Sequence, residues 1–310
     1  MSRLSSISRL FLITIAACTG SAVTAQSSNS PEELCNRTNL EATAKIHGYI
    51  FKSYSSDSGS CLQVIAENKV IFRRTDDSRT AYTLGQHADS TNNIPAIPNG
   101  TDITGRGQPN MIVTFWSGGA HCCLDHYVFE LEPKFTFLAT IKGRDDDLAH
   151  FEDLDRNGNY YYVGGDWTFA YWYGSFAGSP NHEVILRWVD APDGGSFHLA
   201  LDKMHKPPPT LAEWQQALQD VRHELHLEQT NYANALPHVL WQQIFDLIYT
   251  GHPDLAWKFL DEVGPDAQSS RYHFPDLGDF CSTLKTSYYW PDIAPTLKDA
   301  PAKCRNAKPD

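Results

Sequence analysis

The sequence predicts an α+β protein in which an N-terminal antiparallel β meander, arranged as a partial propeller-like sheet or a sandwich, precedes an all-α helical domain. Apolar, β-branched and aromatic runs separated by turn residues occupy residues 31–205. After Pro207-Pro208-Pro209, apolar residues instead recur at steps of three and four residues, which is typical of helices. We therefore expect a β-rich domain over residues 31–205 and a helical domain over residues 210–310.

The most regular β region lies near the middle of the chain. Residues 110–116, 124–131 and 134–141 form three apolar runs, and Glu132-Pro133 turns the second run into the third. This spacing predicts an antiparallel meander. Further strands are predicted at residues 61–66, 70–74, 160–163, 168–172 and 184–188.

Helix signals dominate the last hundred residues. Thr210 and Glu213 have the spacing of a capping box, which satisfies two backbone donors at a helix start. Prolines and glycines predict the bounds of three later helices, at residues 237–251, 253–264 and 275–285. The proline-containing tail after residue 287 is expected to fray unless a bridge between Cys281 and Cys304 holds it.

Charge excludes one class of partner. The chain has a formal net charge of −12 and no basic stripe. Such a surface repels the phosphate backbone, so we expect no nucleic-acid binding.

The first 25 residues predict an export signal. Arg3 and Arg9 flank an apolar run that is too short to span a bilayer, and a small-residue stretch ends at Ala25. An alternative interpretation is a lipobox, which would leave a lipid anchor on Cys18. Apart from this leader we expect no transmembrane segment, and either route predicts an exported protein of the periplasm or cell envelope.

Six cysteines remain after the leader: Cys35, Cys61, Cys122, Cys123, Cys281 and Cys304. An even count in an exported chain predicts disulfides. We expect Cys35 to pair with Cys61 and Cys281 with Cys304, since each pair lies within one segment. Cys122 and Cys123 then form a strained bridge between neighbours or pair with distant partners.

An Asp-rich loop precedes the predicted strand at residue 160. Asp153, Asp155 and Asn157 alternate before Gly158, and alternate oxygen-bearing side chains ahead of a glycine turn can wrap a hard cation. With the backbone carbonyl of Asn159, these residues predict a Ca²⁺ site. The alternative is an Asx-turn loop without an ion.

A second stretch has the same pattern 51 residues earlier, from Asp102 to Asn110. On these two loops the chain resembles the FG-GAP (VCBS-type) repeat family, whose motif is Asp-x-Asn-Gly-Asp-Gly-x-x-Asp followed by an apolar strand. The run from Trp116 to Cys123 also resembles a segment of exported bacterial proteins that carry this repeat. The resemblance implies β-propeller blades with calcium at the Asp-rich loops, although Arg106 stands where an acidic ligand belongs.

These observations favour a non-catalytic binding or structural module of the periplasm or envelope, with a Ca²⁺-stabilised loop and a protein or glycan partner. Aromatic residues at 167–176 are expected mainly in the core, and an exposed row of them would stack on sugar rings. The alternative function is an envelope polysaccharide hydrolase that draws its acid and base from Asp145, Asp146, Asp147, Asp153 and Asp166.

Overall fold

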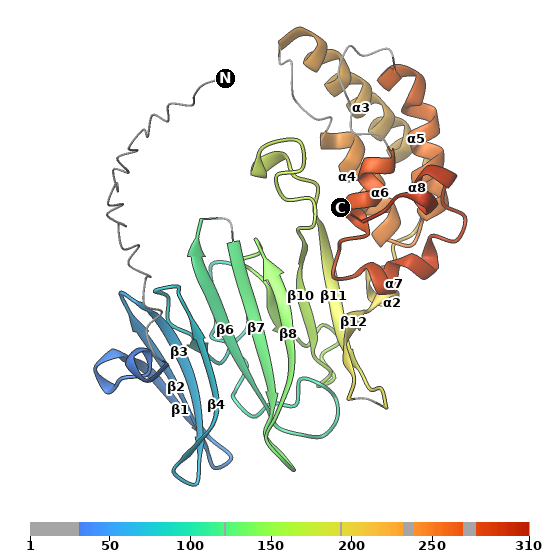
Figure 1. Ribbon diagram of the computed structural model, residues 1–310. Coiled ribbons are helices and arrows are strands. Elements are labelled where there is room, and N and C mark those ends of the chain that lie inside the picture. The colour runs from blue at the N-terminus through green and yellow to red at the C-terminus, as the bar shows by residue number, and fades with distance from the viewer. Residues whose placement is uncertain (1–30, 121, 193, 232–237, 269–276, 310) are drawn as a thin grey trace, which may run out of the picture.

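The fold consists of three antiparallel sheets followed by a group of helices (Figure 1). This computed structural model describes residues 31–309 except 121, 193, 232–237 and 269–276. The predicted leader and Cys18 lie outside the described residues. Strands end at Leu199 and helices follow from Leu201, so the α+β prediction is confirmed.

Each sheet has four strands, and each is a meander in which chain neighbours pair. The first sheet contains β1 (Leu40–Ile46), β2 (Tyr49–Ser56), β3 (Gly59–Ala66) and β4 (Lys69–Asp76). The second contains β5 (Thr83–Leu84), β6 (Asn110–Gly119), β7 (Cys122–Glu130) and β8 (Thr136–Arg144). The third contains β9 (His150–Glu152), β10 (Tyr161–Asp166), β11 (His182–Val189) and β12 (Ser196–Leu199).

Short helices flank the sheets and longer ones pack beside the third sheet (Figure 1). Before β1 lie α1 (Pro31–Leu34) and η1 (Arg37–Asn39), and η2 (Phe176–Gly178) precedes β11. The C-terminal elements are α2 (Leu201–Met204), α3 (Leu211–Asn231), α4 (His238–Tyr249), α5 (Pro253–Gln268), α6 (Leu277–Leu284), α7 (Trp290–Ile293), η3 (Ala294–Thr296) and α8 (Ala302–Asn306). Thr210 donates its backbone N–H to the Glu213 carboxylate over 2.7 Å and accepts the Glu213 N–H over 3.3 Å, which confirms the capping box.

The second sheet is buried on both faces because successive side chains of a strand point in opposite directions. Met111 and Val113 of β6 pack with Phe51 in the core shared with the first sheet. Ile112, between them, packs with Phe151 in the core shared with the third sheet. The three sheets therefore stack in series in chain order.

The third sheet and the helices share one hydrophobic core. Phe169, which follows β10, stacks on Phe280 of α6 with ring centroids 4.9 Å apart. Trp241 of α4 stacks on the same Phe280 ring at 5.0 Å. The change from strands to helices falls between Leu199 and Leu201, before the predicted division near residue 207, and the packing continues across it.

Residues 168–172 do not form the predicted strand. Tyr171 and Tyr173 have φ values of 60° and 49°, in the left-handed region, which no extended strand can contain. Hydrogen bonds from Ala170 N to Trp167 O and from Trp172 N to Phe169 O close tight turns instead. We call residues 167–178 the aromatic loop. Its aromatic content favours a strand by propensity, but tertiary packing overrides this weak preference.

Two predicted disulfides are confirmed. Cys35 is bonded to Cys61, and Cys281 is bonded to Cys304. Cys123 is also disulfide-bonded, while the side chain of Cys122 lies outside the described residues. Among the helices that the structure describes, none is long and apolar enough to cross a bilayer.

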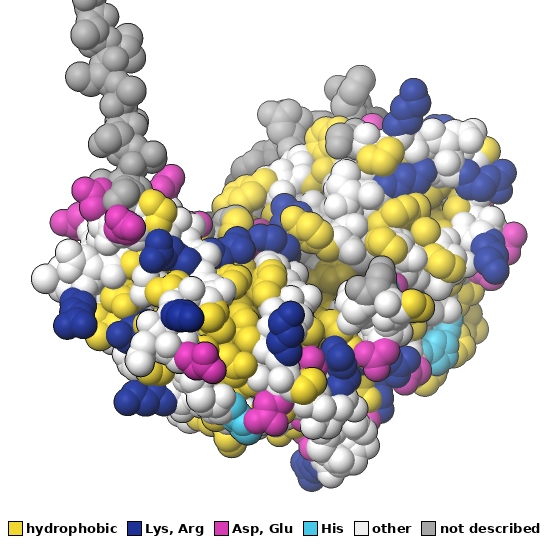
Figure 2. All heavy atoms as spheres, turned by 60° about the horizontal axis from the view of Figure 1, so that its bottom comes forward, with side chains coloured by type: hydrophobic (Ala, Val, Ile, Leu, Met, Phe, Trp, Pro, Cys, Tyr) yellow, Lys and Arg dark blue, Asp and Glu magenta, His cyan; other side chains and the backbone are white. Residues whose placement is uncertain are grey.

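Charged side chains are mixed on the face in Figure 2. Lys and Arg lie there among Asp, Glu and hydrophobic side chains rather than in one stripe. The absence of nucleic-acid binding stays a prediction.

Candidate functional site

A cleft lies where the upper ends of β6, β7 and β8 meet the aromatic loop, which rises beside them in Figure 1. Its volume is about 410 Å³. We call it the hairpin–loop cleft. Its lining residues are Trp116, Gly119, Ala120, Leu124, Arg144, Asp145, Asp147 and Phe176.

One wall is the hairpin between β6 and β7. The register shifts between Trp116, which pairs with Leu124, and Gly119, which pairs with Cys122. The indole N–H of Trp116 donates to the carbonyl of Gly119 over 3.0 Å, which fixes the ring beside the irregular end of the hairpin. The ring is 46% exposed. A large apolar side chain is thus held in contact with solvent at the edge of a cavity.

The aromatic loop lines the cleft through Phe176. Phe176 stacks on Trp167 with centroids 4.8 Å apart and planes at 13°, and Tyr171 lies 5.6 Å from Phe176. Tyr171 and Tyr173 are 53% and 57% exposed. Their left-handed backbone costs about 1–3 kcal/mol at each position, and such conformations persist only where the surroundings impose them. The loop therefore presents aromatic rings outward on a backbone held by other contacts.

The turn after β8 supplies the charged groups of the cleft. Arg144, with φ 51°, begins this turn, and Asp145 and Asp147 line the cavity beside it. Asp146 lies between them with its carboxylate directed into the protein, where it accepts the N–H of Leu148 over 3.0 Å. Burial raises the pKa of Asp146 above its ordinary value. Two carboxylates and one guanidinium thus line the same cavity as Trp116 and Phe176.

Protein-family models, curated proteins and solved structures give no match to this chain. The FG-GAP resemblance therefore stays a prediction from the two Asp-rich loops. Their geometry can be compared within the chain itself.

The two loops have the same hydrogen-bond pattern. The two carboxylate oxygens of Asp102 accept the N–H groups of Arg106 and Gly107. Those of Asp153 accept the N–H groups of Asn157 and Gly158, at the same spacings of four and five residues. Each aspartate therefore closes its loop as the Asx-turn alternative describes.

The predicted calcium ligands are already engaged within the protein. The carboxylate of Asp155 accepts the ammonium of Lys203 over 2.6 Å and the hydroxyl of Tyr161 over 3.0 Å. The side-chain oxygen of Asn157 accepts the N–H of Asn159 over 2.9 Å. Among the residues that the structure describes, no group of three or more His, Cys, Asp or Glu side chains is placed to hold a metal. As folded here, Lys203 neutralises Asp155, so this arrangement does not fit a bound Ca²⁺, and calcium binding stays a prediction.

The carboxylates of the hydrolase alternative lie in different places. Asp153 precedes β10 and Asp166 ends it, so the length of the strand, about 17 Å, lies between them. Asp166 is only 2% exposed and accepts hydrogen bonds from Tyr249 and Ser287. Of the five predicted carboxylates, only Asp145 and Asp147 line the hairpin–loop cleft.

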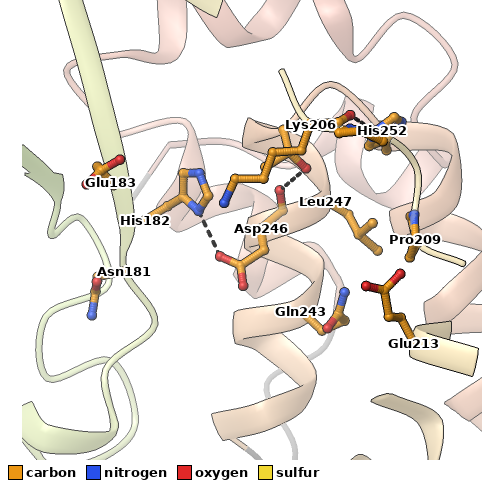
Figure 3. Close-up of a pocket in the computed structure, with 12 residues that line it drawn as sticks. Asn181, His182, Glu183, Lys206, Pro209, Glu213, Gln243, Asp246, Leu247 and His252 are labelled. Carbon is orange, nitrogen blue, oxygen red and sulfur yellow. Dashed lines mark hydrogen bonds and ion pairs between the residues drawn. The ribbon is translucent and has the colours of Figure 1, made fainter. Parts of the chain in front are cut away.

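A second pocket, of about 470 Å³, lies between the start of β11, the linker before α3, and α4 (Figure 3). His182 Nδ1 lies 2.7 Å from the carboxylate of Asp246, to which Gln242 also donates over 2.8 Å. Figure 3 shows the side chains of His182 and Asp246 pointing toward one another. We interpret them as a joint between β11 and α4, because their polar atoms satisfy each other.

The sequence does not indicate Trp116 or Arg144 as cleft residues, whereas Phe176 belongs to the aromatic run at residues 167–176 for which sugar stacking is an expectation. No local motif links the run from Trp116 to residues 144–147 or to the aromatic loop. One signal was available, namely the large aromatic residue directly before the turn at Ser117 and Gly118.

Proposed function

We propose that this protein is an exported, non-catalytic binding module that attaches to a component of the cell envelope through the hairpin–loop cleft. The observation that carries this proposal is that two aromatic side chains from different segments, Trp116 and Phe176, line one cavity. Ligand pockets typically enclose about 300–1,000 Å³ and combine aromatic walls with a few polar groups, as this cleft does.

Export is supported by the disulfides. Disulfides persist in oxidising compartments and are rare where thiols are kept reduced. The Cys35–Cys61 and Cys281–Cys304 bridges indicate a protein that folds outside the cytoplasm. The finer assignment to the periplasm or envelope is part of the proposal, and the sequence of residues 1–25 supports it.

A binding role is favoured over hydrolysis by the placement of the carboxylates. A glycosidase needs two carboxyl groups facing the bond that is cleaved, one of them a general acid with a raised pKa. Asp146, whose pKa is raised, points into the protein and does not line the cleft. The two carboxylates that line the cleft, Asp145 and Asp147, lie two residues apart in one turn after β8.

The test is co-sedimentation of the mature protein with isolated bacterial envelopes. We expect wild type to sediment with the envelopes, and Trp116→Ala and Phe176→Ala to stay in the supernatant. Tyr288→Ala is the matched control, since Tyr288 is a 60% exposed aromatic residue between α6 and α7. Wild-type protein that stays in the supernatant, or cleft variants that sediment as wild type does, would contradict the proposal.

A further inference from the structure

We infer that the ligand of the hairpin–loop cleft is a neutral, hydroxyl-rich glycan chain. This inference rests on the proposed function, since it takes the cleft as the binding site. It goes further by naming the chemistry of the ligand from the shape, the aromatic rings and the charges of the site.

The shape of the site favours a chain of small rings over a protein surface. Stable protein partners bury about 800 Å² on each side, over 20–30 residues, on broad surfaces. Here the exposed aromatic residues border a concave cavity of about 410 Å³ with a lining of eight residues. A cavity of this volume accepts a ligand inserted between its walls.

The apolar half of the site matches one side of a sugar ring. A pyranose ring presents a face of C–H groups, which packs on the flat surface of an aromatic ring, and it carries its hydroxyls around the rim. Trp116 is immobilised by its own indole hydrogen bond to Gly119, and Phe176 by its stack on Trp167. Rigid aromatic side chains bind with little loss of side-chain entropy.

The polar half matches the hydroxyl rim. Asp145 and Asp147 supply carboxylate oxygens that accept from hydroxyls, and Arg144 supplies guanidinium N–H groups that donate to them. Hydrogen bonds to charged partners are stronger than those between neutral groups, which suits recognition of polar hydroxyls in water.

The charge of the site selects against an acidic glycan. The cleft has two carboxylates against one guanidinium, and the whole chain has a formal net charge of −12. A polysaccharide rich in phosphate or uronate would meet repulsion both at the site and at long range. A neutral glycan meets neither.

The aromatic surface continues beyond the cavity. Tyr171 lies beside Phe176, with ring centroids 5.6 Å apart, and is more than half exposed. A chain of several sugars can therefore place one ring in the cleft and a later ring against Tyr171. We expect Tyr171 to contribute to the binding of longer oligosaccharides and not to that of a disaccharide.

The experiment is calorimetric titration of the mature protein with neutral oligosaccharides of two and six sugars. The series covers glucose, mannose, galactose and N-acetylhexosamine polymers, with uronate polymers and cationic amino-sugar polymers of matched length. We expect at least one neutral hexasaccharide to bind, with affinity lowered about tenfold or more by Trp116→Ala and by Phe176→Ala. Tyr171→Ala should weaken the hexasaccharide alone, and Tyr288→Ala should change neither. Far-UV circular dichroism checks that each variant is folded.

The outcomes separate this inference from the proposed function. If envelopes bind through Trp116 but no neutral oligosaccharide competes, and protease treatment of the envelopes removes binding, the glycan inference is overturned while the binding function stands. Tighter binding of a charged polymer than of any neutral one overturns it as well. Release of new reducing ends, lost in Asp147→Asn, would instead show a hydrolase and contradict the non-catalytic function.

Discussion

The buried carboxylate of Asp166 gives the sharpest test of how the cleft is supported. It ends β10 directly before the aromatic loop, and it accepts hydrogen bonds from Tyr249 of α4, from Ser287 over 2.7 Å and from Thr168 N over 2.9 Å. Burial, together with the neighbouring charge of Asp166, raises the pKa of Tyr249 well above its ordinary value, so the hydroxyl stays protonated and donates. We predict that Tyr249→Phe destabilises the protein and loosens the aromatic loop.

The expected magnitude follows from what the substitution removes. Phenylalanine keeps the ring, which packs edge-to-face on Phe245 with centroids 4.8 Å apart, so little apolar contact is lost. The missing hydroxyl withdraws one hydrogen bond from a buried carboxylate, which costs about 1.5–3 kcal/mol. Ser287→Ala should cost a similar amount and also leaves the N–H of Tyr289 without its acceptor. The losses in the double variant should depart from additivity, because both hydroxyls donate to the same carboxylate oxygen of Asp166.

Urea denaturation at pH 7 measures these free energies of unfolding, and tyrosine-to-phenylalanine exchange at the exposed Tyr288 is the control. Oligosaccharide affinity of the Tyr249→Phe variant reports on the loop. A loss below about 0.5 kcal/mol, with unchanged affinity, would show that Tyr249 does not hold the Asp166 carboxylate and would refute the reasoning.

Three further predictions concern the bridge, the Asp-rich loop and a buried histidine. Replacing Cys281 and Cys304 together by alanine should lower the free energy of unfolding by about 3.4 kcal/mol, which the loop-entropy relation gives for a sequence separation of 23. A loss below about 1 kcal/mol, measured by urea denaturation, would contradict this prediction. If Ca²⁺ binds the Asp-rich loop, it must displace Lys203 from Asp155. The rise in melting temperature on adding Ca²⁺ after EDTA should therefore be larger in Lys203→Met than in wild type. A melting temperature that Ca²⁺ changes in neither protein rejects the calcium prediction. Burial lowers the pKa of His126 from 6.5 to about 3, so the unfolded chain binds a proton that the folded one refuses. The contribution of His126 to the free energy of unfolding is therefore fully present above pH 6.5, and it falls by about 2 kcal/mol between pH 6 and pH 4.5. Urea denaturation of wild type and of His126→Asn across this pH range measures the effect. The part of the pH dependence that His126 causes should be absent from the variant.

Local chemistry made much of the fold predictable. The capping box at Thr210, the bridge from Cys281 to Cys304 and the meander of the second sheet each depend on residues close together in sequence. Predictions were wrong where distant packing decides the conformation. The aromatic loop has strand-like composition but folds as turns, and α5 continues to Gln268 past Gly264, where Phe259 and Val263 hold the preceding turns in the core.

The candidate site was less predictable than the fold for the same reason. The Asx-turn alternative for residues 153–159 describes the hydrogen bonds of that loop, because an aspartate bonding to nearby backbone amides needs only local sequence. The partnership of Asp155 with Lys203 joins residues 48 positions apart and could not be derived from the motif. The cleft brings together three segments through sheet register, and register is set by the whole β arrangement.

The helices explain how the strained aromatic loop keeps its shape, and α4 holds it at its start, in its middle and at its end. Tyr249 holds Asp166 at the start of the loop, and Trp241 packs edge-to-face on Trp172 in its middle at 5.4 Å. At its end, the imidazole ring of His238 packs against Gly178, where a Cβ would stand 2.1 Å from the ring. A backbone clamped at both ends and in its middle can hold tyrosines in left-handed conformations that a free loop would leave. The shared core of sheet and helices thus has a functional consequence, since damage to α4 should weaken ligand binding at a cleft that α4 does not line.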